Sequence, residues 1–183
     1  DHLGVELTLV GEGDADLGGA ARLDHVRIGD DDAVRTDDDS GAERGLHALL
    51  RHAEALAEQG CNIVISDINQ ENCDKTAQMI ADKYGVKAIG VAANVTKKAD
   101  NTALAQAAVE KLGRLDIWVN NAGVLRDDLF MRMSEEDWDL VQNVCLKGVF
   151  FGIQAATKVM MKAKYGKIIN ISSVAGLVGS PGQ

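Results

Sequence analysis

From residue 60 onwards, short apolar runs alternate with longer segments in which apolar residues recur at helical spacing. The run Cys61–Ser66 is rich in β-branched residues and lies between Gly60 and Asp67, which predicts a buried strand. Strands that alternate with helices of this length form βαβ units, so we expect an α/β fold, a Rossmann-like doubly wound parallel sheet. The further strands are predicted at 86–92, 115–120 and 167–171, and the helices at 70–84, at 98–112 and from 134 to about 163.

The ends of these helices have local signals. Gly85 and Gly113 follow the first two helices and are expected to be their C-caps. Ser134 precedes three acidic residues, which is typical of a helix start. The helix that begins there is long, so we expect a break or bend near Lys147 and Gly148.

The pattern is weaker before residue 60. Val5–Val10 alternates apolar and polar residues and is a candidate strand, and residues 45–58 are a candidate helix. The acidic runs 29–32 and 36–40 fit neither element. A central parallel strand is usually apolar throughout, so the first strand of the fold is doubtful.

The charge changes abruptly along the chain. Residues 1–54 contain 14 of the 28 acidic residues, five arginines, no lysine and all four histidines, whereas residues 55–183 carry equal numbers of acids and bases. We therefore divide the chain into an atypical acidic segment, 1–54, and a partial α/β domain, 55–183. Our hypothesis is that the first segment is not native to this fold, being a frame-shifted translation or a fusion, and that it is mobile or supplies only Val5–Val10 to the sheet.

Composition excludes several classes of protein. The net charge of −9 is unfavourable for a nucleic-acid partner. No stretch reaches the roughly 20 apolar residues that a membrane helix needs, and no basic-then-apolar leader is seen. The cysteines are odd in number and lack metal-ligand spacing, so we expect no metal site and a reducing, cytoplasmic location. They are Cys61, Cys73 and Cys145.

Polar residues with a chemical use follow the predicted strands. Asn120, Asn121, Ala122 and Gly123 come directly after a strand, where small residues let a flat nicotinamide ribose approach the backbone and asparagines can tie neighbouring strands together. Asp67 ends another strand, where a carboxylate can accept hydrogen bonds from an adenosine ribose and repel a 2′-phosphate. Its alternative role is to begin a turn. The sequence thus favours NAD over NADP.

These motifs resemble the short-chain dehydrogenase/reductase family, which carries Leu-Asp-x-x-Val-Asn-Asn-Ala-Gly where this chain has residues 115–123. The stretches 125–139, 146–150 and 168–176 are similar to its 3-oxoacyl-carrier-protein reductase branch in particular. The resemblance covers about 128 residues, from 56 to 183. It implies an NAD- or NADP-dependent oxidoreductase that transfers a hydride to a carbonyl substrate, either a small molecule or an acyl group on a carrier protein, in a homotetramer.

The family resemblance implies further site residues. Asn94-Val95 stands where the family has Asp-Val, whose acid receives the adenine amino group; Asn94 can accept through its carbonyl oxygen, or serve as a helix N-cap. Ser173 matches the serine that hydrogen-bonds the substrate carbonyl. Cys145 replaces an asparagine that helps to hold a water in a proton relay, and a thiol is a poor replacement.

Two parts of the family pattern are missing. The proton donor is a tyrosine in a Tyr-x-x-x-Lys pair, expected 13 residues after Ser173 and therefore beyond Gln183, so we expect an incomplete fold and an inactive chain. The phosphate-binding glycine loop is matched loosely by Gly41 and Gly45, and still more loosely by glycines from 11 to 19. In the family's strand order, 3-2-1-4-5, the doubtful first strand is central. The alternative function is a non-catalytic nucleotide-binding or interaction domain.

Overall fold

The computed structural model of the chain describes residues 6–11 and 41–178, with side chains from Leu50 onwards. Five strands form one sheet in the order β3-β2-β1-β4-β5, which confirms the predicted order. The strands are β1 (Glu6–Gly11), β2 (Cys61–Asp67), β3 (Ala88–Ala92), β4 (Ile117–Asn120) and β5 (Lys167–Asn170). The helices are α1 (Gly41–Glu58), α2 (Gln70–Tyr84), α3 (Lys98–Leu112), α4 (Glu135–Val141), a π-helical segment (Gln142–Gly148), α5 (Val149–Ala163) and a 3₁₀ turn (Val174–Gly176).

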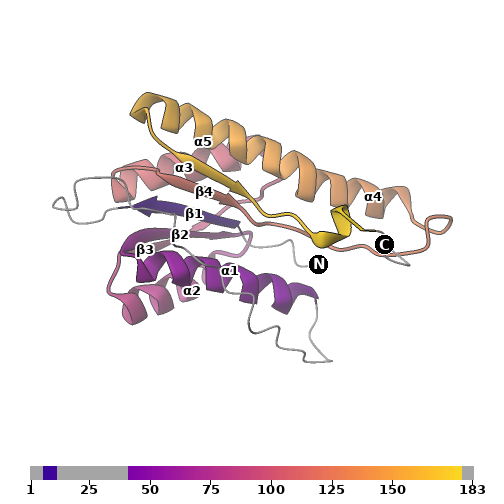
Figure 1. Ribbon diagram of the computed structural model, residues 1–183, viewed down its shortest axis with the longest axis horizontal. Helices are drawn as coiled ribbons and strands as arrows, with labels where there is room; N and C mark the ends of the chain where they lie inside the picture. Colours follow the sequence, from indigo (N-terminus) through magenta and orange to yellow (C-terminus); the bar gives the residue numbers. More distant parts are fainter. Residues whose placement is uncertain (1–5, 12–40, 179–183) are drawn as a thin grey trace.

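Strand β1 occupies the central position but runs in the unexpected direction. It is antiparallel to β2, with Glu6 opposite Ser66 and Gly11 opposite Cys61, and antiparallel to β4. Its arrow in Figure 1 points away from that of β5. The pairs β2–β3 and β4–β5 are parallel, as expected. Our expectation of a wholly parallel sheet is therefore wrong at β1 alone.

The sequence around β1 is compatible with this reversal. Alternating apolar and polar residues, as in Val5–Val10, are typical of antiparallel strands. A strand of either direction satisfies the backbone groups of its neighbours, so the centre of the sheet has no open edges. Because β1 is reversed, its last residue, Gly11, lies beside the start of β2, at one edge of the sheet. Helix α1 begins at the opposite edge, beyond the end of β2. Residues 12–40 lie between them, enough chain to span the sheet.

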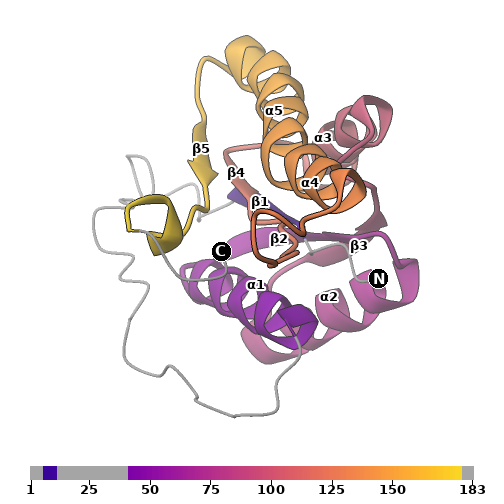
Figure 2. The ribbon, with the colours of Figure 1, turned by 90° about the vertical axis from the view of Figure 1, so that its right-hand side faces the viewer.

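Helices cover both faces of the sheet. Figure 2 shows α1 and α2 on one face and α3 and α5 on the other. Alternate residues of the buried β2 enter two separate cores: Ile63 and Ile65 pack with Ala53, Leu56 and the α2 side, whereas Val64 packs with the α3 and α5 side. Burial on both faces explains why β2 is apolar almost throughout.

The local helix signals are confirmed. Gly85 and Gly113 adopt φ of 70° and 88° at the ends of α2 and α3, a backbone conformation that glycine adopts without strain. The Ser134 side chain accepts a hydrogen bond from Asp137 N at 3.1 Å and so caps α4. The irregularity expected near residue 148 is the π-helical segment, which ends at Gly148. A Cβ on Gly148 would lie 3.0 Å from Val95 Cγ2, so the glycine permits close packing there.

The expected division between residues 54 and 55 falls inside α1. This helix is continuous from Gly41 to Glu58, and Ala53 lies in the same core as Leu56. Glu54 Oε1 accepts a hydrogen bond from Lys83 Nζ of α2 at 2.7 Å. The change in composition therefore does not mark the edge of the folded unit. The acidic runs 29–32 and 36–40 lie outside the described residues.

One helical stretch in the described part of the chain, Glu135–Ala163, has a length and composition that would allow it to cross a membrane. Its buried residues Ala155, Ala156 and Met160 pack against Trp118 and the buried side of α3. Such packing is that of a core helix in a folded domain, and it accounts for the apolar residues on the buried side of α5.

Candidate functional site

The polar residues singled out from the sequence lie at one edge of the sheet. Strands β2, β3, β4 and β5 share one direction and end at this edge with Asp67, Ala92, Asn120 and Asn170. In doubly wound folds, ligands bind outside the carboxyl ends of the strands, where the strand order reverses. That reversal falls at the centre of this sheet, between the β2–β3 pair and the β4–β5 pair. We call this edge, together with the loops that leave it, the carboxyl edge.

Asp67 is buried at the carboxyl edge and is held by its neighbours. Its Oδ1 accepts a hydrogen bond from Asn69 N at 2.7 Å, so the turn that the sequence left open is present. The Cys73 thiol on α2 accepts from Asp67 N at 3.0 Å and donates to the carbonyls of Asp67 and Val91 at 3.6 Å. The Cys73 contacts hold the Asp67 backbone, and the Asn69 bond engages one of the two carboxylate oxygens.

The Asn94–Val95 turn adjoins Asp67, since Ala93 N donates to Asp67 O at 2.9 Å. The Asn94 side-chain oxygen accepts two hydrogen bonds, from Thr96 N at 3.0 Å and from Thr96 Oγ1 at 2.7 Å. Asn94 closes a turn onto Thr96, but the alternative role of helix N-cap is wrong, because the N-cap of α3 is Lys97 and has no side-chain cap bond. The acceptor role expected of Asn94 meets an oxygen that is already engaged. Val95 is buried beside Val124 and Val144, which joins this turn to the loop after β4 and to the π-helical segment.

Asn120 ties strands together through its side chain. Its Oδ1 accepts from Trp118 Nε1 at 2.7 Å, and its Nδ2 donates to Asn170 Oδ1 on β5 at 2.7 Å. Gly152 of α5 lies against this relay, because a Cβ there would collide with Asn120 Oδ1 and stand 2.8 Å from Trp118 Nε1. The strand-tying role predicted for an asparagine in this motif is confirmed, and Asn120 is 3% exposed, so its side chain is used inside the protein.

The residues that follow Asn120 form the open part of the edge. Gly123 is exposed, and among the described residues beyond its chain neighbours the atom nearest to a Cβ there would be Cys145 Sγ, at 3.8 Å. The Cys145 thiol, on the π-helical segment, accepts from Val124 N at 3.4 Å and donates to Val124 O at 3.6 Å. The thiol therefore holds the backbone just past Gly123, a role that the sequence did not indicate.

His52 is a site residue that sequence reasoning missed. It lies on α1, and its side chain hydrogen-bonds Asn121 of the loop after β4. Burial lowers the pKa of His52, and the bond to Asn121 raises it by less, so the neutral imidazole is favoured. Its Nδ1 is buried without a partner among the described residues. A lone histidine in a helical pattern carries no signal of such a contact.

Ser173 follows β5 at the same edge and is exposed. Its Oγ accepts a hydrogen bond from Ala175 N at 3.2 Å, which caps the 3₁₀ turn. This bond orients the hydroxyl and leaves its proton able to donate to a carbonyl oxygen outside the protein.

The glycines considered for a phosphate loop are separated by the fold. Gly41 and Gly45 lie in the first turns of α1, whose end joins β2 directly, so the N-terminus of α1 is directed to the carboxyl edge. A helix N-terminus presents backbone N–H groups suited to an anion. Gly11 lies at the opposite edge, and glycines 13, 18 and 19 lie outside the described residues. Of the looser glycine cluster, the described Gly11 is therefore not at the carboxyl edge.

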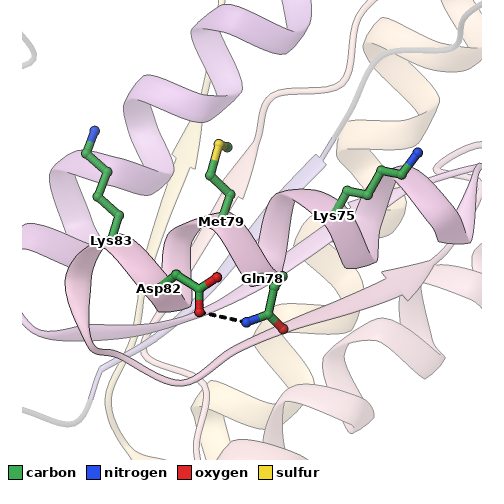
Figure 3. A pocket seen from close by; sticks show the side chains of 5 residues that line it. All are labelled: Lys75, Gln78, Met79, Asp82 and Lys83. Carbon is green, nitrogen blue, oxygen red and sulfur yellow. Dashed lines mark hydrogen bonds between the residues drawn. The ribbon is translucent and has the colours of Figure 1, made fainter.

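Figure 3 shows a hollow whose five lining side chains all come from α2, with Gln78 Nε2 donating to Asp82 Oδ1 at 2.8 Å. Gln78 and Asp82 bond within α2, and Lys83 pairs with Glu54 of α1, so these polar groups have structural partners. Among residues 41–178, no group of three or more His, Cys, Asp or Glu is placed to hold a metal ion.

The three cysteines should differ sharply in reactivity. Burial raises the pKa of the Cys73 thiol to about 11 and also raises that of Cys61, whereas Cys145 is exposed. At pH 8 only about a thousandth of Cys73 would be thiolate, the reactive form. We expect a disulfide reagent to modify one thiol quickly and the other two only after unfolding. Cys145→Ser should remove the fast phase, and fast release of two thiols would contradict this assignment.

Comparison with known proteins agrees with this geometry. The profile of the family described as short chain dehydrogenase matches residues 40–183. The 3-oxoacyl-[acyl-carrier-protein] reductase FabG of Staphylococcus aureus (strain Mu50 / ATCC 700699) is 42% identical over 145 residues, which are 79% of this chain and 58% of the relative. The reductase of the same name from Thermotoga maritima is 42% identical over 128 residues, 70% of this chain and 52% of the relative.

Solved structures give the same result. A protein described as a short-chain alcohol dehydrogenase from Sinorhizobium meliloti 1021 has a TM-score of 0.67 at 36% identity, covering 71% of this chain and 51% of the other. An NAD⁺-bound xylitol dehydrogenase has a TM-score of 0.69 at 28% identity, covering 73% and 51%. The chain thus spans between half and three-fifths of the length of the relatives it matches.

Proposed function

Because the chain belongs to the short chain dehydrogenase family, we propose that it is the dinucleotide-binding part of an NAD(P)-dependent oxidoreductase whose substrate is a 3-oxoacyl thioester or a similar carbonyl compound. The observation that carries the proposal is the convergence at the carboxyl edge of Asp67, the Asn94–Val95 turn, the Asn121–Gly123 loop and Ser173. The substrate class is supported by the identity to 3-oxoacyl-[acyl-carrier-protein] reductases.

The described residues fit the two halves of a dinucleotide differently. On the adenosine side, Asp67 keeps one carboxylate oxygen for a ribose hydroxyl, because Asn69 N occupies the other. On the nicotinamide side, the half-buried Ala122 and the exposed Gly123 have little or no side chain, which lets a flat ring approach the backbone. The diphosphate would lie near the N-terminus of α1, at Gly41 and Gly45. When bound, the nicotinamide donates or accepts the hydride.

The residues of the chain itself position the substrate. Ser173 donates its hydroxyl proton to the substrate carbonyl, while Ala175 N holds its oxygen in place. The bond between Asn120 and Asn170 keeps β4 and β5 in register, so that Ser173 and Gly123 stay at a constant separation. In this proposal the substrate is free or attached to a carrier protein, the enzyme works in the cytoplasm, and the assembly is a homotetramer. Exposed apolar side chains along α4 to α5 suit such an assembly: Trp138, Leu146, Phe150 and Met161.

A second function, a nucleotide-binding domain without chemistry, is favoured by one observation. The printed 183 residues contain no Tyr-x-x-x-Lys pair, because four residues after Tyr84 stands Ala88 and four after Tyr165 stands Ile169. We propose that the 183-residue chain by itself binds cofactor but does not turn over. Measuring binding and turnover separately distinguishes the two functions.

Cofactor binding tests the proposal through Asp67. Replacing Asp67 by Ala should shift the ratio of NAD to NADP affinity towards NADP by tenfold or more, because a hydrogen bond to a charged acceptor contributes roughly 1.5–3 kcal/mol and the carboxylate also repels a 2′-phosphate. Both dissociation constants are measured by titration calorimetry. Asp82→Ala is the matched control, since Asp82 lies on the outer surface of α2 (Figure 3). An unchanged ratio removes Asp67 from the site, and a wild-type chain that binds neither dinucleotide contradicts the proposed function.

A further inference from the structure

The orientation of the Asn94 amide is fixed by its hydrogen bonds. Thr96 N–H can only donate, so the side-chain atom that faces it at 3.0 Å must be the oxygen. Thr96 Oγ1 donates to the same oxygen at 2.7 Å. A carbonyl oxygen has two lone pairs, and both are now used. The amide nitrogen, with two N–H donors, is the part of Asn94 left to contact a ligand.

The backbone of this turn is also held in place. Asn94 N donates to Asp100 Oδ2 at 2.9 Å, and Lys97 N donates to Asn94 O at 2.9 Å. The Val95 carbonyl accepts a hydrogen bond from Asn101 Nδ2 at 2.8 Å, and the Val95 side chain is buried. Turning the amide over would place N–H groups against the Thr96 N–H, leaving a donor unpaired at a cost of about 1–3 kcal/mol.

The position of the turn determines which part of a nucleotide it meets. Asp67 ends β2, and the Asn94 turn follows β3, the next strand away from the centre of the sheet. The diphosphate of a dinucleotide lies near the centre and the adenosine ribose at the end of β2. The purine base is farther from the diphosphate than its ribose is, so a dinucleotide bound in this way would place the base over the end of β3, on the side of the Asn94 turn.

We propose that Asn94 presents a donor to the group at position 6 of the bound purine, and thereby weakens the preference for a 6-amino purine over a 6-oxo purine. This inference rests on the proposed function. Adenine carries an amino group at position 6, a donor that cannot pair with the Asn94 N–H, whereas hypoxanthine carries a carbonyl oxygen, which can. A donor that faces a donor is a mismatch that lowers affinity for that ligand.

The test compares NAD⁺ with nicotinamide hypoxanthine dinucleotide on the full 183-residue chain, by titration calorimetry. In Asn94→Asp, one carboxylate oxygen keeps both bonds from Thr96 and the other becomes an acceptor. We expect this variant to shift the affinity ratio about tenfold towards NAD⁺. Ring nitrogen N1 accepts in adenine and carries a hydrogen in hypoxanthine, and its contribution cancels between wild type and variant when its protein partner is a group other than the Asn94 side chain. Gln106 is an exposed residue of α3, and Gln106→Glu, which adds a negative charge there, should leave the affinity ratio unchanged.

A second variant covers the possibility that a carboxylate beside Asp100 prevents folding. Thr96→Val removes the Oγ1 bond and keeps the N–H bond, so the Asn94 oxygen regains one lone pair. We expect a shift of about threefold towards NAD⁺. The proposal is overturned if folded Asn94→Asp has a ratio of NAD⁺ to hypoxanthine-dinucleotide affinity within a factor of two of wild type. If only Thr96→Val folds, an unchanged ratio in that variant overturns it. Binding of neither dinucleotide by wild type contradicts the proposed function itself, and this inference with it.

Discussion

Replacing Gly152 by alanine is expected to destabilise the chain by about 3 kcal/mol, although alanine is the better helix former by about 1 kcal/mol. The reason is steric: a Cβ at this position of α5 would collide with Asn120 Oδ1 and lie 2.8 Å from Trp118 Nε1. Both atoms belong to the relay that joins β4 to β5, and each is buried. Overpacking costs about 1–3 kcal/mol, and a buried polar group that loses its partner costs a similar amount.

The free energy of unfolding from urea titrations measures this effect. Gly176→Ala is the matched control, because a Cβ there meets no atom of the described residues within 4 Å, and its change should stay within about 0.5 kcal/mol. If Gly152→Ala were as stable as wild type, the close packing of α5 on Asn120 would be wrong. The fixed separation between Gly123 and Ser173 would then lose its structural basis.

The 183-residue chain is expected to show no turnover while still binding NADH. Among the residues printed, none stands as the tyrosine of a Tyr-x-x-x-Lys pair, and loss of a positioned general acid typically lowers the rate about 10²–10⁴-fold. Cys145 contributes in addition, because its thiol is committed to the Val124 backbone and is a weaker hydrogen-bonding group than the asparagine of the family pattern.

NADH oxidation with an acetoacetyl thioester is the measurement, with boiled protein as the control. Binding, followed in parallel by NADH fluorescence, shows whether an inactive sample is folded. Oxidation well above the boiled control would contradict the prediction and would require a proton donor that is not Tyr84 or Tyr165. NADH binding without oxidation is the expected result.

Much of the fold is predictable because its signals are local. Runs of β-branched residues bounded by Gly60 and Asp67 predict a buried strand, and β2 spans Cys61–Asp67. Glycine needs no partner elsewhere in the chain to cap a helix, so Gly85 and Gly113 are correctly expected from their places in the pattern. The strand order follows from the family resemblance.

The same reasoning explains where prediction stopped. The direction of β1 depends on how its backbone pairs with strands 50 or more residues away, and no residue of Glu6–Gly11 encodes that choice by itself. The boundary placed after residue 54 followed charge, whereas Ala53 and Glu54 contact the core and α2 through the tertiary fold.

At the site, the sequence by itself determined which chemical groups follow each strand: the carboxylate of Asp67, the amides of Asn94 and Asn120, and the hydroxyl of Ser173. Only the tertiary structure decided which atoms of those groups are already engaged. Asn120 bonds Asn170, 50 residues away, and His52 reaches Asn121 from another helix. The physical reason is that a hydrogen-bond partner is chosen by position in space, which a linear pattern describes only for residues one or two turns apart.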